Sequence, residues 1–153
     1  MVQVVFVCLG NICRSPMADA VFQQMVKEAG LAEQIQVDSA GTGGWHAGEK
    51  AHRGTRQILA KHGVPYDGRA RQVAERDMTP KTYVIAMDSQ NKADLEARFG
   101  THPRLHMLLS FAERAEVIDV PDPYYTGNFD YVYELVSDGC RGLLAHIRAE
   151  EGL

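Results

Sequence analysis

The stretch Val7-Cys8-Leu9-Gly10-Asn11-Ile12-Cys13-Arg14-Ser15-Pro16 decides the fold of this chain. The apolar run from Val2 to Val7 before it is rich in β-branched residues, which favours a strand that is buried on both faces. After it a helix is predicted to begin, with Ser15 as its N-cap and Pro16 as its first residue. The stretch therefore predicts a strand, a tight loop and the start of a helix.

The loop between these two elements has the composition of an anion site. Cys8 and Arg14 stand six positions apart, so the loop can curl around one anion with its backbone N–H groups and the positive end of the helix pointing inward. Gly10 is expected to turn the chain with a positive φ, and Asn11 tolerates the same conformation.

The two charged or ionisable members of the loop suit phosphate chemistry. Arg14 offers a planar fork that matches two phosphoryl oxygens, which a lysine would not. The same positive field favours ionisation of a thiol, so we expect Cys8 to be a thiolate at neutral pH. A buried structural cysteine and an ordinary helix-start arginine would explain each residue alone, but not the whole motif. The motif predicts a phosphate site that carries a nucleophile.

Composition limits the kinds of protein this chain can be. Its 153 residues suffice for one core, so we expect a single domain over residues 1–153. The net charge of −4 argues against a nucleic-acid partner. No apolar run is long enough to span a membrane and no signal-peptide pattern is present, so we expect a cytoplasmic protein without a membrane partner. The odd count of three cysteines fits a reducing compartment. No metal site is predicted, because Cys8 and Cys13 have no second close pair of cysteines or histidines and the six histidines are scattered along the chain.

Strand and helix patterns alternate along the rest of the chain. Further strands are predicted at residues 35–39, 82–87 and 105–109, and further helices at 51–62, at 89–100 and from about 128 onward. The alternation predicts an α/β fold, a four-stranded parallel sheet with helices on both faces and the phosphate loop at the end of strand 1. Asp88 is expected to cap the helix at 89, segment 66–76 to be a solvated loop despite Arg69 and Arg71, and Cys140 to belong to the core.

The motif from Cys8 to Pro16 closely resembles the phosphate loop of the low-molecular-weight protein tyrosine phosphatases. The resemblance covers nearly the whole chain, because Asp38-Ser39-Ala40-Gly41-Thr42, Met87-Asp88 and Asp122-Pro123-Tyr124-Tyr125 match family segments in the same order. It implies hydrolysis of phosphotyrosine through a cysteinyl-phosphate, with Cys8 as the nucleophile and Asp122 as the general acid and then the base.

The resemblance also implies roles for the residues around this centre. The phosphate-binding residues would be Leu9, Gly10, Asn11, Ile12, Cys13, Arg14 and Ser15. Ser15 would donate a hydrogen bond to the Cys8 sulfur, while Asn11 and Ser39 would fix the shape of the loop. Trp45, Tyr124 and Tyr125 would line a slot for the substrate ring, although from the residues alone Trp45 fits a local packing anchor equally well.

The partners that follow are a phosphotyrosine protein as substrate, and phosphate or other oxyanions as product-like inhibitors. No cofactor is expected, and no exposed apolar stripe calls for a dimer, so we expect a monomer. Cys13 has two open interpretations: a small apolar filler behind the loop, or a thiol that captures oxidised Cys8 as a disulfide.

Three rival functions are less consistent with the residues. Thioredoxin-linked arsenate reductases have a fold and a loop similar to those expected here, but they use further cysteines in the middle of the chain. This chain has no cysteine between Cys13 and Cys140. Bacterial protein-arginine phosphatases carry a threonine where this chain has Ile12, and they lack the paired tyrosines. A mere phosphate-binding module would have no use for a nucleophile, an arginine and an acid together. The sequence therefore favours phosphotyrosine as the substrate.

Overall fold

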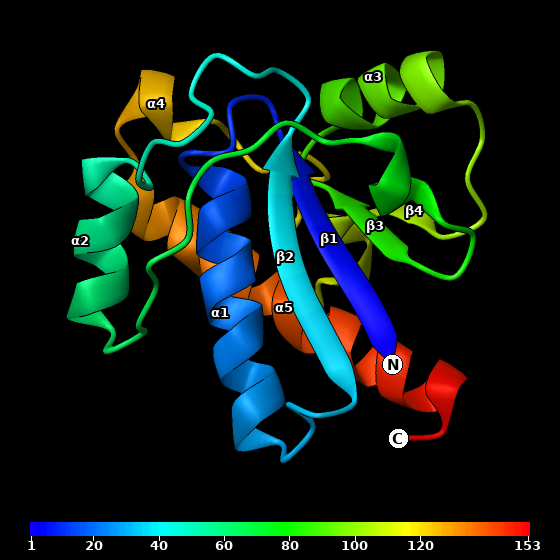
Figure 1. Cartoon of the computed structure of the whole chain (residues 1–153). Coiled ribbons are helices and arrows are strands. Elements are labelled where there is room, and N and C mark those ends of the chain that lie inside the picture. The colour runs from blue at the N-terminus through cyan, green and yellow to red at the C-terminus, as the bar shows by residue number, and fades with distance from the viewer.

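The computed structural model describes all 153 residues and contains one four-stranded sheet flanked by helices (Figure 1). The strands are β1 (Val2–Cys8), β2 (Ile35–Gly41), β3 (Tyr83–Ala86) and β4 (Leu105–Met107). Every pairing is parallel and the spatial order is β2-β1-β3-β4. The predicted α/β fold with a four-stranded parallel sheet is confirmed.

Five α-helices and two short 3-10 helices connect and follow the strands. They are α1 (Arg14–Glu28), α2 (Arg53–Lys61), α3 (Ser89–Phe99), α4 (Pro123–Thr126) and α5 (Phe129–Glu151), with η1 (Glu75–Met78) and η2 (Leu108–Phe111). None of the helices combines the length and the apolar character that crossing a bilayer requires.

The two faces of β1 belong to two different cores, because successive side chains of a strand point to opposite sides. Val4 and Phe6 face the larger core, which α1, α2 and α5 complete. Val5 and Val7 face a smaller core that includes Leu95 of α3. Helices therefore cover both faces of the sheet, as predicted, and β1 is buried on both sides (Figure 1).

The end of the fourth predicted strand is wrong. The expected strand over 105–109 stops at Met107, and Leu108 begins the 3-10 helix η2. A continuing strand would send Leu108 and Leu109 to opposite faces, whereas both side chains are buried in the larger core. Leu108 fits closely over Gly139 of α5, where an added Cβ would lie only 2.6 Å from its Cγ. The packing of Leu108 on Gly139 explains why the chain turns into a 3-10 helix at this point.

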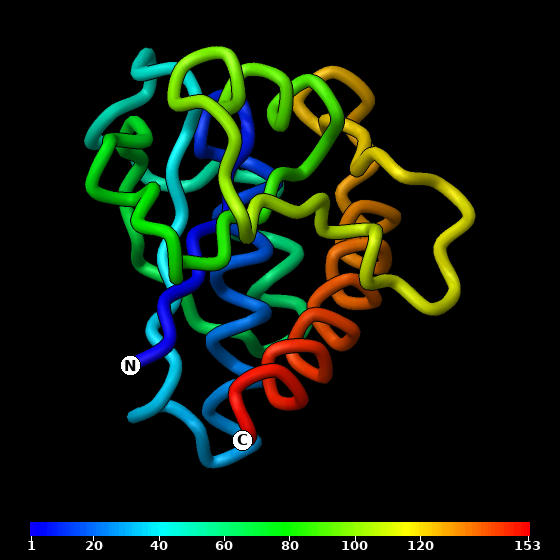
Figure 2. Tube along the Cα trace, turned by 90° about the vertical axis from the view of Figure 1, so that its right-hand side faces the viewer, coloured from blue at the N-terminus to red at the C-terminus, as the bar shows by residue number.

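One buried carboxylate anchors the segment between η2 and α4, which Figure 2 shows as a wide loop. Asp138 of α5 accepts hydrogen bonds from the backbone N–H groups of Glu113, Arg114 and Ala115, at 3.0, 3.0 and 2.8 Å. Burial opposes ionisation of Asp138, but the three N–H donors outweigh it and lower its pKa below the usual range. The same loop leads to Asp122.

We expect Asp138→Ala to lower the free energy of unfolding by about 2 kcal/mol, because three backbone donors lose a charged acceptor. Since the native carboxyl has a lowered pKa, its contribution is present above the unfolded-state value and is lost as the pH falls through the native value. Urea unfolding at pH 7 and at pH 3 would measure both effects. The control is Asp130→Ala. Asp130 lies on the same helix as Asp138 but forms only an exposed ion pair with Lys61 of α2, so its loss should change the free energy of unfolding by only tenths of a kcal/mol. Equal losses in both variants would contradict the anchoring role.

Candidate active site

The loop that joins β1 to α1 lies at the carboxyl edge of the sheet, between Cys8 and Arg14. The helix begins at Arg14, with Cys13 at the cap position and without a side-chain cap bond, so the prediction that Ser15 is the N-cap is wrong. The Ser15 hydroxyl is used elsewhere: it lies 3.0 Å from the Cys8 sulfur and accepts a hydrogen bond of 2.8 Å from Asn11 Nδ2. A hydroxyl held toward the loop cannot fold back onto the helix N-terminus.

The backbone of the loop is oriented for an anion. No N–H group of residues 9–15 donates a hydrogen bond to a protein acceptor. The carbonyls do have partners: Leu9 O accepts from Gly43 N at 2.9 Å and Ile12 O accepts from His52 N at 2.7 Å. The carbonyls are thus held by the surrounding chain, while successive N–H groups remain free beside the positive end of α1. Such an arrangement is a concave binding site for a negatively charged group.

The turn of this loop depends on Asn11 rather than on Gly10. Asn11 has a φ of 58°, and it is the only residue other than glycine with a positive φ. Gly10 does not have a positive φ, so that expectation is wrong. A side chain at Gly10 would instead crowd His46, because an added Cβ would lie 3.1 Å from the imidazole Cδ2. A side chain at this position would require the His46 ring to move by a few tenths of an ångström.

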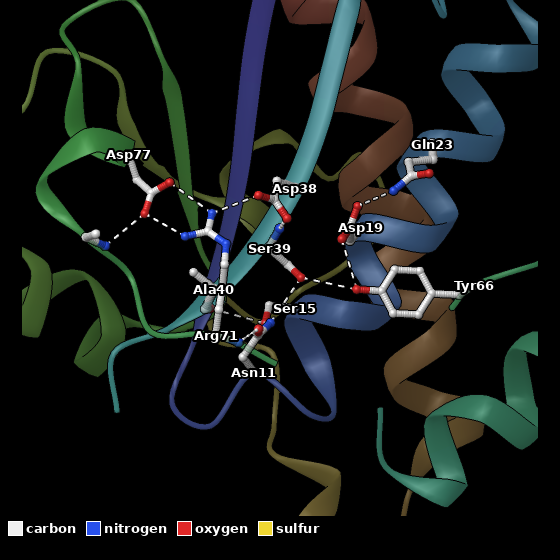
Figure 3. Close-up of polar contacts among 11 residues, drawn as sticks. Asn11, Ser15, Asp19, Gln23, Asp38, Ser39, Ala40, Tyr66, Arg71 and Asp77 are labelled. Carbon is white, nitrogen blue, oxygen red and sulfur yellow. Dashed lines mark hydrogen bonds and ion pairs between the residues drawn. The ribbon is translucent and has the colours of Figure 1, made fainter. Parts of the chain in front are cut away.

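The side chain of Asn11 fixes its own unusual backbone conformation. Its Nδ2 donates to Ser15 Oγ at 2.8 Å and to Ser39 Oγ at 3.0 Å, while its Oδ1 accepts from Arg71 N at 2.9 Å. Asn11, Ser15 and Ser39 are all buried. The loop is thus connected to β2 and to the 66–76 segment by directed hydrogen bonds (Figure 3).

The 66–76 segment is more structured than predicted. Arg71 is not solvated: its guanidinium forms two 2.9 Å bonds with Asp77 and one of 2.9 Å with Asp38 (Figure 3). Burial opposes ionisation of Asp77, but the bonds from Arg71 outweigh it and lower the pKa of the carboxyl. Asp38 in turn accepts from the backbone N–H of Ser39 at 2.8 Å. This ion-pair cluster supports the rear of the loop.

Arg14 is almost completely buried, with 3% of its surface exposed, and it faces two carboxylates. Its Nη1 donates to Asp88 Oδ2 at 2.6 Å and to the carbonyl of Val120 at 2.9 Å, while Nη2 lies 3.5 Å from Asp122 Oδ2. Nε is buried and has no partner in the protein. The Nε and Nη2 edge of the guanidinium is therefore the part that can bind a phosphoryl group in a bidentate manner.

The charge of Arg14 is secured by its surroundings. Burial works against the charged form, but the Cys8 sulfur, Asp88 and Asp122 outweigh burial and raise the pKa of the guanidinium above its ordinary value. Asp88 also caps α3, as predicted, by accepting from Asn91 N at 2.7 Å. Its contact with Arg14 was not predicted, since the two residues are distant in the sequence and Asp88 already had a local role.

A pocket of about 270 Å³ opens above the loop. It is lined by Cys8, Leu9, Gly10, Ile12, Cys13, Arg14, Trp45, His46, Asp122, Tyr124 and Tyr125. The structure thus brings the predicted nucleophile, arginine, acid and aromatic residues to one cavity. His46, whose Nδ1 lies 2.9 Å from Glu49 Oε2, also lines it and was missed, because a histidine in a glycine-rich segment carries no periodic or spacing signal.

The aromatic residues of the pocket are exposed on its rim. Trp45 is 71% exposed, Tyr124 54% and Tyr125 77%, so all three rings are accessible to a ligand. The Trp45 ring covers Gly43, where an added Cβ would lie 1.9 Å from the ring. Tyr124 packs edge-on against the ring of His52, with 5.9 Å between centroids. These rings can contact a flat group that enters the pocket.

Ser39 and Asp122 have further contacts that fix their positions. Asp122 is the N-cap of α4 and accepts from Tyr124 N at 3.1 Å, with Pro123 in the first turn. Ser39 lies on β2 behind the loop, in contact with Asn11 and not with the pocket. No group of three or more His, Cys, Asp or Glu residues is arranged to bind a metal ion.

Cys13 differs chemically from Cys8. Burial, followed by the charges of Asp122 and Cys8, raises the pKa of the Cys13 thiol to about 12. All three cysteines are free. Capture of oxidised Cys8 would require Cys13 to lose its proton against this shift, and the disulfide stays a prediction that mass spectrometry after mild peroxide treatment would test.

At pH 7.5 we expect iodoacetamide to label Cys8 at least about a hundredfold faster than Cys13, because the thiolate is the reactive species. The labelling rate of Cys13 should rise about tenfold per pH unit between pH 7 and 9, as expected of a thiol far below its pKa. Mass spectrometry of the peptides separates the two sites. Comparable labelling of both cysteines at pH 7.5 would contradict the raised pKa.

Comparison with known proteins gives one consistent result. The family model described as low molecular weight phosphotyrosine protein phosphatase matches residues 3–152. The low molecular weight protein-tyrosine-phosphatase YfkJ of Bacillus subtilis is 49% identical, with 100% of both chains covered, and PtpA of Staphylococcus epidermidis is 44% identical over 100% of this chain and 98% of that protein.

Solved structures agree with the sequence matches. The crystal structure of YfkJ superposes with a TM-score of 0.94 at 48% identity, covering 98% of this chain and 96% of that one. A crystal structure described as a Drosophila arginine phosphatase has a TM-score of 0.86 at 32% identity, with 95% of this chain and 97% of that one covered.

Proposed function

The chain belongs to the low-molecular-weight protein tyrosine phosphatase family, and we propose that it hydrolyses phosphotyrosine in two steps through a cysteinyl-phosphate on Cys8. The protein is a protein-tyrosine-phosphatase, and the observation that carries the proposed mechanism is the row of free N–H groups at residues 9–15 around the Cys8 sulfur. These N–H groups donate to no acceptor within the protein, so they are available to the oxygens of one phosphoryl dianion. The whole chain, residues 1–153, would act as one phosphatase domain.

In the first step the Cys8 thiolate attacks phosphorus in line with the phenolic oxygen. The S–P bond forms as the bond between phosphorus and that oxygen breaks. The loop N–H groups and the Nε and Nη2 edge of Arg14 stabilise the charge on the three equatorial oxygens. Asp88 and the Val120 carbonyl occupy the other side of the guanidinium and orient it for this contact.

Asp122 supplies the proton for the departing phenolate. In the free enzyme its Oδ2 lies 3.5 Å from Arg14 Nη2. A bound dianion takes this place on the guanidinium, and its negative charge favours the protonated form of a nearby carboxyl. The proton then passes to the phenolic oxygen as the P–O bond breaks.

In the second step water replaces the tyrosine product. Asp122, now ionised, accepts a proton from that water, whose oxygen attacks phosphorus while the S–P bond breaks. The products are inorganic phosphate and the Cys8 thiolate, so phosphate and similar oxyanions would inhibit as product analogues. Ser15 Oγ, 3.0 Å from the sulfur, can donate to the departing thiolate, which makes sulfur a better leaving group.

The pocket wall favours a phosphotyrosine substrate over a phosphoarginine one. Trp45, Tyr124 and Tyr125 offer exposed rings that can pack on a planar aryl group. Ile12, which also lines the pocket, presents an apolar side chain with no acceptor for a guanidinium N–H. The similarity to the Drosophila arginine phosphatase makes phosphoarginine the alternative that an experiment has to exclude.

The test is hydrolysis of matched peptides that carry phosphotyrosine, phosphoserine or phosphoarginine, with EDTA present throughout. We expect the phosphotyrosine peptide to be hydrolysed with the highest kcat/KM, and no release of phosphate by Cys8→Ser. A preference for phosphoarginine would overturn the substrate assignment, and no turnover of any peptide would overturn the proposed function.

A further inference from the structure

One group of positively charged side chains has no part in the mechanism above. The chain has 20 acidic and 16 basic residues, yet no aspartate or glutamate occurs from residue 50 to residue 66. The basic surface consists of Lys50, Arg53, Arg56 and Arg69, which are all exposed and form no ion pair. Its charge is opposite in sign to the net charge of −4 of the whole protein.

The backbone places two of these cations directly beside each other. Their segments are joined by two hydrogen bonds of 2.8 Å, from Gly48 N to Ala70 O and from Ala70 N to Glu49 O. Lys50 and Arg69 are therefore opposite one another in an isolated antiparallel bridge. Like charges that face each other across paired strands are destabilising. The fold gains nothing from this pair of cations.

The other two cations belong to the amino-terminal part of α2. Arg53 is the first residue of this helix and Arg56 the fourth, and the first turn contains no acidic residue. Cations are disfavoured at the positive end of a helix dipole. Arg56 Nε donates to the carbonyl of Ala51 at 2.9 Å, which holds this guanidinium at the start of the helix. The basic surface thus concentrates positive charge although the fold would be more stable without it.

The surface also has room for a negatively charged group. Lys50, Arg56 and Arg69 line a hollow of about 330 Å³, in which Asp67 is the only acidic residue. The other acid close by, Glu49, already has a partner, because its Oε2 lies 2.9 Å from Nδ1 of His46. Two acids thus lie beside four cations, and an excess of positive charge remains.

The basic surface adjoins the active-site pocket. His52 precedes Arg53, and its backbone N–H donates to Ile12 O at 2.7 Å. The His52 ring packs edge-on against Tyr124, with 5.9 Å between centroids, so α2 begins next to α4 (Figure 1). Ile12 and Tyr124 both line the pocket. A substrate chain that leaves the pocket on this side therefore meets the basic surface.

We propose that the basic surface binds acidic residues of the substrate, so that the enzyme prefers a phosphotyrosine flanked by aspartate or glutamate. The inference rests on the proposed phosphotyrosine activity. His46 lines the pocket and Lys50 follows four residues later, so their Cα atoms are at most about 14 Å apart. An extended peptide spans this distance in about four residues. Acidic residues within about four positions of the phosphotyrosine can therefore reach the surface.

The expected effect is on the capture of the substrate and not on the chemical steps. Opposite charges speed the encounter of two molecules and orient them, while each exposed pair adds only modestly to affinity. The preference should therefore appear in kcat/KM. It should also weaken in salt, because the Debye length is about 10 Å at 0.1 M ionic strength and shorter above it.

The experiment uses two phosphotyrosine peptides that differ only in carrying glutamate or glutamine at the second to fourth positions on either side of the phosphotyrosine. The variant Lys50→Gln/Arg53→Gln removes two charges of the basic surface. The control Lys27→Gln/Lys81→Gln removes the same charge at the opposite edge of the sheet, since Lys27 is in the last turn of α1 and Lys81 precedes β3. Both control lysines are exposed.

For each protein we would measure Tm and kcat/KM with both peptides and with p-nitrophenyl phosphate, at about 0.05 M and about 0.5 M salt. The net charge of −4 alone would make the glutamate peptide the poorer substrate. We expect the reverse in wild type: a preference for the glutamate peptide of about tenfold at low salt and about twofold or less at high salt.

In Lys50→Gln/Arg53→Gln we expect kcat/KM with the glutamate peptide to fall about fourfold to tenfold at low salt. The values for the glutamine peptide and for p-nitrophenyl phosphate should stay within about twofold of wild type, because neither ligand has an acidic residue for the surface. Tm should be no lower than in wild type, since the variant relieves the repulsion between Lys50 and Arg69. The control should keep the wild-type preference.

Three results would overturn the inference. They are equal kcat/KM for the two peptides in wild type, an unchanged preference in Lys50→Gln/Arg53→Gln, and an equal loss in the control, which would indicate an effect of net charge alone. No turnover of any substrate by wild type would instead refute the proposed function. The affinities of Cys8→Ser for the two peptides, measured by calorimetry, would still test the basic surface, so the two failures are distinguishable.

Discussion

Replacing Cys8 by serine is expected to lower kcat at least about 10⁴-fold while the enzyme still binds its substrate. Serine has nearly the same size, but its hydroxyl is not ionised at neutral pH and is a poor nucleophile without a base. The N–H groups of residues 9–15 and the Arg14 guanidinium remain in place to bind phosphate. Since a thiolate repels a phosphoryl dianion, affinity should be unchanged or higher.

Calorimetric titration of Cys8→Ser with a phosphotyrosine peptide, beside a turnover assay, would measure both quantities. Cys140→Ala is a suitable control, because Cys140 is a fully buried core thiol on α5 outside the pocket, and its loss should affect Tm and not kcat. Substantial residual turnover of Cys8→Ser, or loss of binding with an intact fold, would contradict the assignment.

Replacing Asp122 by asparagine is expected to lower kcat about 10²-fold to 10⁴-fold with phosphotyrosine, the range for loss of a general acid and base. Asparagine retains an oxygen to accept from Tyr124 N, so the start of α4 should be unchanged. The loss of kcat/KM, which reports the first step, should be smaller with p-nitrophenyl phosphate, because p-nitrophenolate departs without a proton. Only a group that protonates the leaving oxygen gives this difference between substrates.

Steady-state kinetics with aryl phosphates of graded leaving-group basicity would measure the effect. Asp119→Asn is the matched control: Asp119 belongs to the same loop, but it bonds the backbone N–H of Ser89 and does not line the pocket. Equal losses of kcat/KM, which reports the first step, for good and poor leaving groups in Asp122→Asn would show that Asp122 is not the acid.

The parts of the fold that local patterns determine were predictable. The β-branched run before Cys8 and the helix stripe from Val132 to Ile147 each depend on the burial of a regular face, and both occur as predicted. The strand-to-helix loop was predictable for the same reason, since its residue types suit one narrow conformation. Element ends were less predictable, as at Leu108, where packing against Gly139 outweighs strand preference.

The residues that support the site were not predictable, because their roles arise from contacts between distant parts of the chain. Asp88 looked like a helix cap and is one, but it also bonds Arg14, which is 74 positions away. Arg71 looked like a solvated cation: its partner Asp77 is only six positions away but carries no recognisable spacing signal, and its other partner, Asp38, lies on β2. The Tyr66 hydroxyl donates to Asp19 of α1, 47 positions away, and no spacing or motif links the two residues. Buried polar networks of this kind become visible only in three dimensions.

The most direct test of the covalent mechanism is to stop the reaction with phosphotyrosine peptide in denaturant during turnover and to analyse the enzyme by peptide mass spectrometry. A mechanism through a cysteinyl-phosphate predicts a phosphoryl group on the peptide that contains Cys8, present within the first turnover and absent from Cys8→Ser. An enzyme that turns over substrate with Cys8 unmodified throughout, or with the phosphoryl group on another residue, would contradict it.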